Sequence, residues 1–263
     1  MVERIVASIA PYAGRIPGLL AAYKWATSRR GDGRIYTFSS GPMAGLRWRR
    51  DNRLPYWYHR GLYERRISAF LAARLRPGDC YWDIGAHAGY HVLLAARAVG
   101  RDGVVVAVEP DPANCAVLRE QLRVNDVADC TVVEAAVANQ VGRSTLILQD
   151  GDSRGNRLES ARPHPDHTYR GAIDVETVTL DSLAQRLPTP WLLKIDVEGA
   201  ESLVLEGGAQ LFAGPAGPAH VLIEVHGDEE KESCRGLLER HDYTILPGRE
   251  RGGDQYWLIA ERS

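Results

Sequence analysis

The chain has 263 residues, 44% of them hydrophobic and 25% charged, which is typical of a globular protein with one domain and an appended segment. No uncharged apolar run reaches the roughly 18 residues of a membrane span, and Met1–Ala26 lacks the continuous apolar core of a secretory signal, so we expect a cytoplasmic protein. The four cysteines form no C-x-x-C pair, so we expect neither a disulfide framework nor a zinc knuckle. The net charge of −2 hides an asymmetry, because residues 1–80 carry 15 Lys/Arg against 5 Asp/Glu, while residues 81–263 carry 17 against 29.

Residues 1–60 are predicted to form a basic, aromatic-rich extension to a domain over residues 61–263. The basic side chains could attract an anionic substrate, but the favoured interpretation is that they pair with the acidic body or stay solvated. No nucleic-acid-binding module is recognisable, so we expect no nucleic-acid partner. Several side chains of the extension could line an acceptor pocket or pack the extension onto the domain: Trp48, Tyr56, Trp57, Tyr58 and His59.

From Asp79 onward, short apolar runs alternate with helical patterns. Strands are expected over Cys80–Ile84, Val104–Val108, Thr131–Glu134, Trp191–Ile195 and Val221–Val225, and helices over His87–Val99, Pro112–Val124, Asp181–Arg186, Ala200–Phe212 and Glu229–His241. This alternation predicts an α/β fold with a Rossmann-like, doubly wound, mostly parallel sheet of seven strands. The last two strands, Tyr243–Leu246 and Tyr256–Ala260, are predicted to form an antiparallel hairpin at the sheet edge.

The alternation is interrupted by an insert at about residues 136–172. Ala136–Gln149 predicts a β-hairpin that turns at Asn139–Gly142, and the polar stretch Asp150–Gly171 predicts an irregular segment. A long irregular insert in a compact domain is usually functional or mobile. It could cover the acceptor during the reaction, because water competes with a reacting group.

The strongest motif is Asp83-Ile-Gly-Ala-His-Ala-Gly89, placed where the first strand ends and a helix begins. In a doubly wound sheet, ligands bind at the carboxyl ends of the strands. Gly85 permits a sharp turn and Gly89 a close approach of helix and cofactor, while Asp83 could accept hydrogen bonds from a cationic amine. Glu109, 20 residues after Gly89, could accept hydrogen bonds from both hydroxyls of a ribose.

The glycine spacing distinguishes between nucleotide cofactors. A dinucleotide site prefers G-x-G-x-x-G, whose second glycine leaves room for a pyrophosphate. His87 occupies that position and would crowd a pyrophosphate, whereas a sulfonium methyl donor carries no phosphate. The motif therefore favours S-adenosylmethionine over NAD, and an NAD-dependent oxidoreductase is the less favoured alternative.

With these residues in place, the chain resembles the FkbM family of methyltransferases. The stretches that carry the resemblance cover most of residues 61–226 in the family's order: LRPGDCYWDIGAHAGYHVLLAARAVG, VVVAVEPDPANCAVLREQLRVN, VVEAAVANQVGRSTL, VETVTLDSL, LLKIDVEGAESLVLEGG and VLIEVH. KIDVEGAE is the most specific of them. The resemblance implies methyl transfer, usually to a hydroxyl oxygen of secondary metabolites, lipids or sugars.

The resemblance also implies cofactor positions. Gly85, Gly89, Glu109 and Asn114 match those of the family, whereas His87 replaces its usual Asn and Val92 its usual Thr or Ser. Three further residues are expected to line the cofactor site: Ala86, Pro110 and Ala135.

Charged residues gather at the ends of two later strands. Lys194-Ile-Asp196-Val-Glu198 alternates with a period of two, so its charged side chains point one way if the strand continues through them, and Glu224-Val-His226 follows the same pattern. Attack by a hydroxyl calls for a base, and His226 is the first choice because its ordinary pKa of about 6.5 suits proton acceptance. Asp196 or Glu198 could instead hold the hydroxyl or take the proton, and Lys194 could pair with Glu224 or Asp196.

Asp196 and Glu224 also allow a second interpretation, a Mg²⁺ site at neighbouring strand ends. His226 offers a base that needs no metal, so the sequence disfavours this alternative and we predict no metal ligands. His87 and His91 lie four residues apart but lack a third ligand with clear spacing, so they do not predict a zinc site.

The sequence therefore predicts an S-adenosylmethionine-dependent O-methyltransferase whose partner is a small-molecule acceptor, a hydroxylated or glycosylated secondary metabolite. The alternatives within the class are methylation at nitrogen, or of a lipid- or nucleotide-linked sugar recognised by the basic extension. A non-catalytic binding module is disfavoured by the intact Asp196, Glu198 and His226. Neither the acceptor nor the oligomeric state is predicted.

Overall fold

The computed structural model describes residues 32–55, 58–61, 63–151, 153–161, 163, 167–252 and 255–262. The chain divides into one unit that ends at Tyr63 and a second that begins at Glu64. Tyr56 and Trp57, predicted to face an acceptor or to pack, lie outside the described residues, as does Met1–Ala26. The assignment of residues 1–60 to an extension and 61–263 to the cofactor-binding domain stays a prediction.

The first unit contains a short antiparallel pair, β1 (Ile35–Thr37) and β2 (Arg47–Arg49), and the 3-10 helix η2 (Tyr58–Arg60). Its aromatic side chains pack on one another. The ring centroids of Trp48 and Tyr58 lie 5.6 Å apart, and those of Tyr58 and Tyr63 lie 4.1 Å apart. Trp48 and Tyr58 are both buried, so these two rings contribute to packing.

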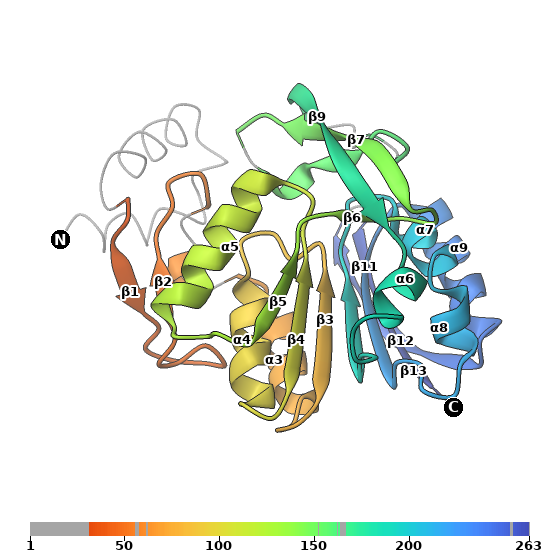
Figure 1. Ribbon diagram of the computed structural model, residues 1–263, viewed down its shortest axis with the longest axis horizontal. Helices are drawn as coiled ribbons and strands as arrows, with labels where there is room; N and C mark the ends of the chain where they lie inside the picture. Colours follow the sequence, from red (N-terminus) through yellow and green to blue (C-terminus); the bar gives the residue numbers. More distant parts are fainter. Residues whose placement is uncertain are drawn as a thin grey trace. The chain divides into compact units, whose positions relative to one another are not determined.

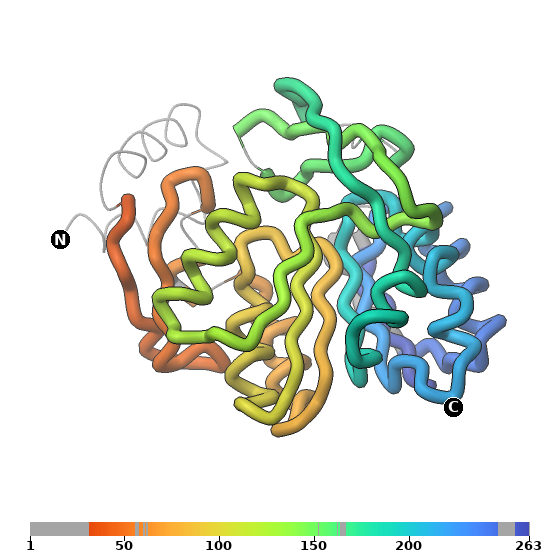
Figure 2. The backbone as a smooth tube through the Cα atoms, in the orientation of Figure 1, coloured from red at the N-terminus to blue at the C-terminus, as the bar shows by residue number. Residues whose placement is uncertain are grey.

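A seven-stranded sheet forms the centre of the second unit (Figures 1 and 2). In spatial order its strands are β12 (Tyr243–Gly252), β13 (Gln255–Arg262), β11 (His220–His226), β10 (Leu192–Ile195), β3 (Cys80–Ile84), β4 (Val104–Val108) and β5 (Cys130–Val133). The pairs from β11 to β5 are parallel, and β13 is antiparallel to both of its neighbours. The predicted Rossmann-like, mostly parallel α/β fold with an antiparallel edge hairpin is confirmed.

Helices cover both faces of this sheet (Figure 1). One layer contains α3 (Arg65–Arg74), α4 (Tyr90–Val99) and α5 (Pro112–Val124), and the other contains α6 (Leu180–Ala184), α7 (Glu201–Glu206), α8 (Ala209–Ala213) and α9 (Asp228–Glu239). None of the helices in the described ranges has the length and apolar character needed to cross a bilayer.

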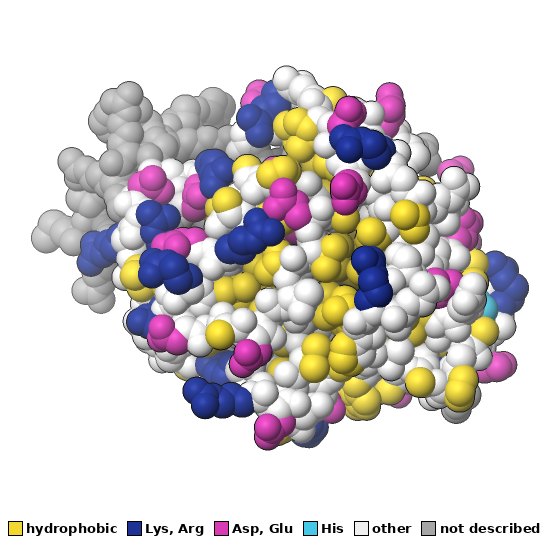
Figure 3. All heavy atoms as spheres, in the orientation of Figure 1, with side chains coloured by type: hydrophobic (Ala, Val, Ile, Leu, Met, Phe, Trp, Pro, Cys, Tyr) yellow, Lys and Arg dark blue, Asp and Glu magenta, His cyan; other side chains and the backbone are white. Residues whose placement is uncertain are grey.

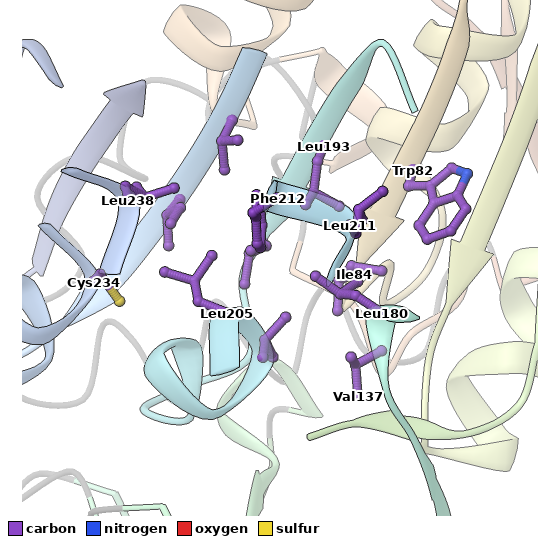
Figure 4. Close-up of a cluster of buried hydrophobic side chains, with 14 of the residues drawn as sticks. Trp82, Ile84, Val137, Leu180, Leu193, Leu205, Leu211, Phe212, Cys234 and Leu238 are labelled. Carbon is purple, nitrogen blue, oxygen red and sulfur yellow. The ribbon is translucent and has the colours of Figure 1, made fainter. Parts of the chain in front are cut away.

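The main apolar core lies between the sheet and the second helical layer. Trp82 and Ile84 of β3 and Leu193 of β10 belong to this core together with Phe212 and Leu238 (Figure 4). Successive side chains of a strand point to opposite faces. The polar residues between these positions therefore point toward the layer of α3 and α4.

Glycines divide the chain where a single longer helix was predicted. The predicted helix Ala200–Phe212 is split into α7 and α8 by Gly207 and Gly208. A Cβ at Gly207 would lie 2.2 Å from the carbonyl oxygen of Ala138, so this close approach excludes a side chain. Likewise α4 begins at Tyr90 and not at His87, because His87 and Gly89 have φ angles of 48° and 82°, outside the helical region.

A second, four-stranded sheet is built from the insert, and Figure 1 shows it beyond the carboxyl ends of β3 and β4. Its order is β6 (Ala136–Val137), β9 (Tyr169–Val178), β7 (Gly142–Gln149) and β8 (Arg157–Leu158). The predicted pairing of the two halves of Ala136–Gln149 is therefore wrong, since β6 and β7 both pair with β9. Burial explains the difference: β9 alternates buried Val175 and Thr177 with exposed residues, and Val175 packs with Leu146 and Leu158.

Candidate active site

The loop after β3 is shaped by two glycines with positive φ. A Cβ at Gly85 (φ 80°) would lie 1.8 Å from the carbonyl oxygen of Asp196, and one at Gly89 (φ 82°) would lie 2.9 Å from Leu118. The protein's own packing therefore requires a glycine at both positions, because Gly85 lies against the end of β10 and Gly89 lies against α5. The loop is held in place at the carboxyl end of the sheet.

Glu109 is the polar centre of this loop. Its Oε2 accepts a hydrogen bond from the backbone N–H of His87 at 2.9 Å, and its Oε1 accepts from the N–H of Asp111 at 3.0 Å and from Nδ2 of Asn114 at 3.1 Å. The residue is 5% exposed. Burial raises the pKa of Glu109 to about 7, although the three donors favour the charged form. A carboxylate has about four acceptor positions, so this geometry leaves room for a further donor.

The remaining predicted cofactor residues lie around Glu109 at the same ends of β3, β4 and β5. The N–H groups of Gly85 and Ala86 both donate to the carbonyl oxygen of Val108, which joins the ends of β3 and β4. Ala86 and Ala135 are buried, and Pro110 is partly buried. This arrangement fits an adenosine-containing cofactor at the strand ends.

The insert is attached to the cofactor loop by two side-chain contacts that the sequence did not reveal. His87 Nε2 lies 2.8 Å from Ser153 Oγ in the 3-10 helix η3 (Ser153–Gly155), and Asn156 Nδ2 donates to Asp111 Oδ2 at 2.9 Å. Ser153 and Asn156 therefore hold this part of the insert against the ends of β3 and β4. Its role as a cover for the acceptor stays a prediction.

Asp83 and Lys194 form a buried ion pair. They are direct partners in the register of β3 and β10, and Lys194 Nζ lies 3.1 Å from Asp83 Oδ1 and 3.4 Å from Asp196 Oδ2. Burial lowers the pKa of Lys194, but the two carboxylates outweigh it and raise that pKa well above its usual range. The carboxylate predicted to meet a cationic amine of the cofactor therefore already has a cation of the protein as its partner.

Carboxylates and an imidazole converge where β10 and β11 end. Acidic and basic side chains are interspersed on the face of the molecule in Figure 3. At the ends of β10 and β11, by contrast, several acidic side chains are gathered in one partly buried cluster. His226 Nε2 lies 3.4 Å from Glu198 Oε2 and 3.9 Å from Glu224 Oε1. One ligand atom from each of Asp196, Glu198 and His226 lies within 4.8 Å of the others. The strand ends at Ile195 and Glu198 has a φ of 57°, so a turn, and not the predicted continuing strand, brings these groups together.

Glu201 is a site residue that sequence reasoning missed. Its Oε1 lies 2.9 Å from His226 Nδ1 and accepts a hydrogen bond from the N–H of Gly199 at 2.9 Å. The side chain is 0% exposed although it begins α7. The available signal was its place at the end of KIDVEGAE, but a glutamate in the first turn of a helix is common for other reasons.

The surroundings of His226 change its chemistry. Burial lowers its pKa, but the hydrogen bond that Nδ1 donates to Glu201 and the charge of Glu198 outweigh burial and raise the pKa of His226 to about 10. An imidazolium cannot accept a proton. The ordinary histidine pKa, which was the reason to predict His226 as the base, does not hold in this cluster.

Two comparisons relate the chain to known sequences. Residues 83–246 match the model of the methyltransferase FkbM domain. The chain is 23% identical over 202 residues to hexuronic acid methyltransferase AglP of Haloferax volcanii, covering 76% of this chain and 77% of that protein. It is 28% identical over 215 residues to 31-O-demethyl-FK506 methyltransferase FkbM of Streptomyces tacrolimicus, covering 72% and 81%.

A solved structure supports the fold. The chain resembles the methyltransferase FkbM from Methylobacillus flagellatus KT with a TM-score of 0.51 and 16% sequence identity. The similarity covers 79% of this chain and 55% of that one.

Proposed function

Because the chain belongs to the FkbM family of S-adenosylmethionine-dependent methyltransferases, we propose that it methylates a hydroxyl oxygen of a small or glycosylated metabolite. The family and its cofactor agree with what the sequence predicted. The observation that carries the proposal is the cluster of Asp196, Glu198 and His226, which lies beside the loop after β3 because Gly85 of that loop approaches the backbone of Asp196.

The names of two relatives favour an oxygen acceptor. The Streptomyces relative is named for a substrate that lacks a methyl group on an oxygen, and the Haloferax relative for a hexuronic acid. A buried acidic cluster also disfavours an anionic reacting group, which like charges would repel. A neutral hydroxyl that loses its proton during the reaction suits this site.

Two sets of side chains divide the work in this proposal. Glu109 accepts a hydrogen bond from a ribose hydroxyl, with Ala86, Pro110 and Ala135 around the adenosine. When bound, S-adenosylmethionine supplies a methyl group that leaves its sulfur for the acceptor oxygen as that oxygen loses its proton.

His226 orients the acceptor hydroxyl, and Asp196 or Glu198 withdraws its proton. Lys194 and Glu224 are positioning residues, since Lys194 holds Asp83 and Asp196 in place and Glu224 faces His226. Glu201 in turn orients His226 by its hydrogen bond to Nδ1.

The test is a panel of acceptors incubated with methyl-labelled S-adenosylmethionine. Hydroxylated macrolides and hexuronic acids are each paired with an analogue whose candidate hydroxyl is blocked, and amines of similar size are included. We expect the label in a methoxy group, recognised by its NMR chemical shift, and no transfer to the blocked analogue. A product labelled at nitrogen would replace the proposal with N-methylation.

Calorimetry with S-adenosylhomocysteine separates the two sets of residues. Glu198→Gln should bind this product normally and lose turnover, because Glu198 belongs to the acceptor end. Glu176→Gln, which removes an exposed carboxylate of β9, is the matched control and should retain both properties. Normal turnover in Glu198→Gln would remove Glu198 from the acceptor site.

A further inference from the structure

The cluster at the ends of β10 and β11 contains the elements of a cation site that differs from the one weighed from sequence. One ligand atom from each of Asp196, Glu198 and His226 lies within 4.8 Å of the other two. His226 Nε2 lies 3.4 Å from Glu198 Oε2. Two ligands of one ion with bonds of about 2.1 Å lie roughly 3 to 3.4 Å apart, so this pair already has the spacing of neighbouring ligands.

The imidazole of His226 points to a ligand. Its side chain is 9% exposed, and its buried Nε2 atom makes no hydrogen bond. A buried ring nitrogen without a hydrogen bond costs free energy unless something else meets it. Coordination of a cation would satisfy this atom and offset the negative charge that surrounds it.

Glu201 supplies the outer contact that histidine ligands usually have. A metal-bound histidine almost always donates its other ring N–H to a carboxylate or carbonyl, which fixes the tautomer and the ring orientation. Here Nδ1 lies 2.9 Å from Oε1 of the fully buried Glu201, which the N–H of Gly199 also holds in place. When a bound cation replaces the proton of Nε2, the proton that stays on Nδ1 leaves the Nε2 lone pair directed at Asp196 and Glu198.

We propose that Asp196, Glu198 and His226 bind one divalent cation of the Mg²⁺ and Mn²⁺ class, with Glu201 orienting His226. Two carboxylates with one imidazole suit such ions better than the sulfur-rich or histidine-rich sets that select softer metals. The carboxylate side chains are 17% and 20% exposed, which leaves a route for the ion and open positions for other oxygens. Glu224, whose Oε1 lies 3.9 Å from Nε2, is within reach as an additional ligand.

In the proposed methyl transfer, a cation at this site would have a specific task, the activation of the acceptor hydroxyl. A cation held at the three side chains would bind the acceptor oxygen and favour loss of its proton, and an acceptor with two adjacent oxygens would bind best. That task rests on the proposed function. The binding of the cation does not, and it is tested without an acceptor or a methyl donor.

The experiment is a titration of chelator-treated, full-length protein with Mn²⁺ alone, followed by electron paramagnetic resonance, which reports the unbound ion. We expect one site per chain. Glu198→Gln and His226→Gln should each weaken binding at least roughly 10-fold, and Glu201→Gln should weaken it by about 10- to 100-fold, as outer contacts of metal sites do. Glu176→Gln should bind Mn²⁺ as the wild type does. Circular dichroism and binding of S-adenosylhomocysteine establish that each variant is folded.

A spectroscopic measurement identifies the ligand directly. Pulsed electron paramagnetic resonance of the Mn²⁺ complex should show coupling to an imidazole nitrogen that disappears in His226→Gln. The proposal is overturned if the folded wild type binds no Mn²⁺, if the nitrogen coupling is absent, or if Glu176→Gln weakens binding as much as Glu198→Gln does. Methyl transfer that persists in excess chelator would leave the proposed function standing and remove the cation's role in the reaction. Tight Mn²⁺ binding without methyl transfer to any hydroxyl would leave the cation site standing and remove the proposed function.

Discussion

The binding of the cofactor's adenosine should depend on the protonation of Glu109. In the absence of cofactor, burial raises the pKa of Glu109 from its ordinary value of 4.5 to about 7, a difference that corresponds to about 3 kcal/mol. The stability that the protonated carboxyl confers is thus present below pH 4.5 and is lost as the pH rises through about 7. A ribose hydroxyl that donates to the carboxylate would favour its charged form and lower this pKa. Cofactor affinity should therefore increase with pH up to about 7 and level off above it.

Glu109→Gln removes the charge and keeps the shape. A hydrogen bond to a charged group contributes about 1.5–3 kcal/mol and a neutral one about 0.5–1.5. For the one acceptor position that the three protein donors leave open, the loss is about 1–1.5 kcal/mol, or roughly 5- to 12-fold in affinity. The new NH2 group would also face N–H donors of His87, Asp111 or Asn114, which occupy both carboxylate oxygens.

The assay is calorimetry of S-adenosylhomocysteine binding from pH 5.5 to 8.5, in pairs of buffers with different ionisation enthalpies. Wild type should release close to one proton per cofactor below pH 7, and Glu109→Gln should release none. Glu134→Gln, an exposed carboxylate that follows β5 and pairs with Arg119, is the matched control and should behave as wild type. A pH-independent affinity together with near-normal binding by Glu109→Gln would refute the ribose assignment.

Three further predictions concern the frame of the site. Lys194→Met leaves Asp83 as an uncompensated buried charge, so chemical denaturation should show that the free energy of unfolding falls by about 3–5 kcal/mol. Adding Asp83→Asn should recover part of this loss. If the effects of the two substitutions were fully additive, the ion pair would be contradicted. Gly85→Ala should lower the melting temperature far more than Gly78→Ala. Both glycines have positive φ, but only the Cβ at position 85 meets a backbone atom, at 1.8 Å, so equal effects would show that φ alone matters. Asn156→Ala removes hydrogen bonds to Asp111 and to the backbone of Gln149, so hydrogen exchange of residues 153–158 should accelerate about 10-fold; unchanged exchange would mean that other contacts hold the insert.

Local pattern was sufficient for the sheet. The parallel strands β3, β4, β10 and β11 are short, largely apolar runs that are buried on both faces. A glycine-rich or polar junction marks the end of each, so the order of strands and helices could be predicted from neighbouring residues alone. The cofactor motif could be predicted in the same way, because Gly85–Gly89 come directly after β3 and Glu109 comes directly after β4. The insert was harder, since the pairing of β6 and β7 with β9 depends on which side chains are buried against residues distant in sequence.

The chemistry of the site was decided by contacts between separate elements. Asp83 and Lys194 are 111 residues apart, and only the adjacency of β3 and β10 makes them an ion pair. Glu201, the first residue of α7, orients His226, which lies 25 residues further along the chain. The polar residues at the strand ends could be identified from the sequence. The protonation of an imidazole, however, depends on which carboxylates surround it and how far they are from water. Charge acts through space and through the local dielectric, and both are set only when the chain is folded.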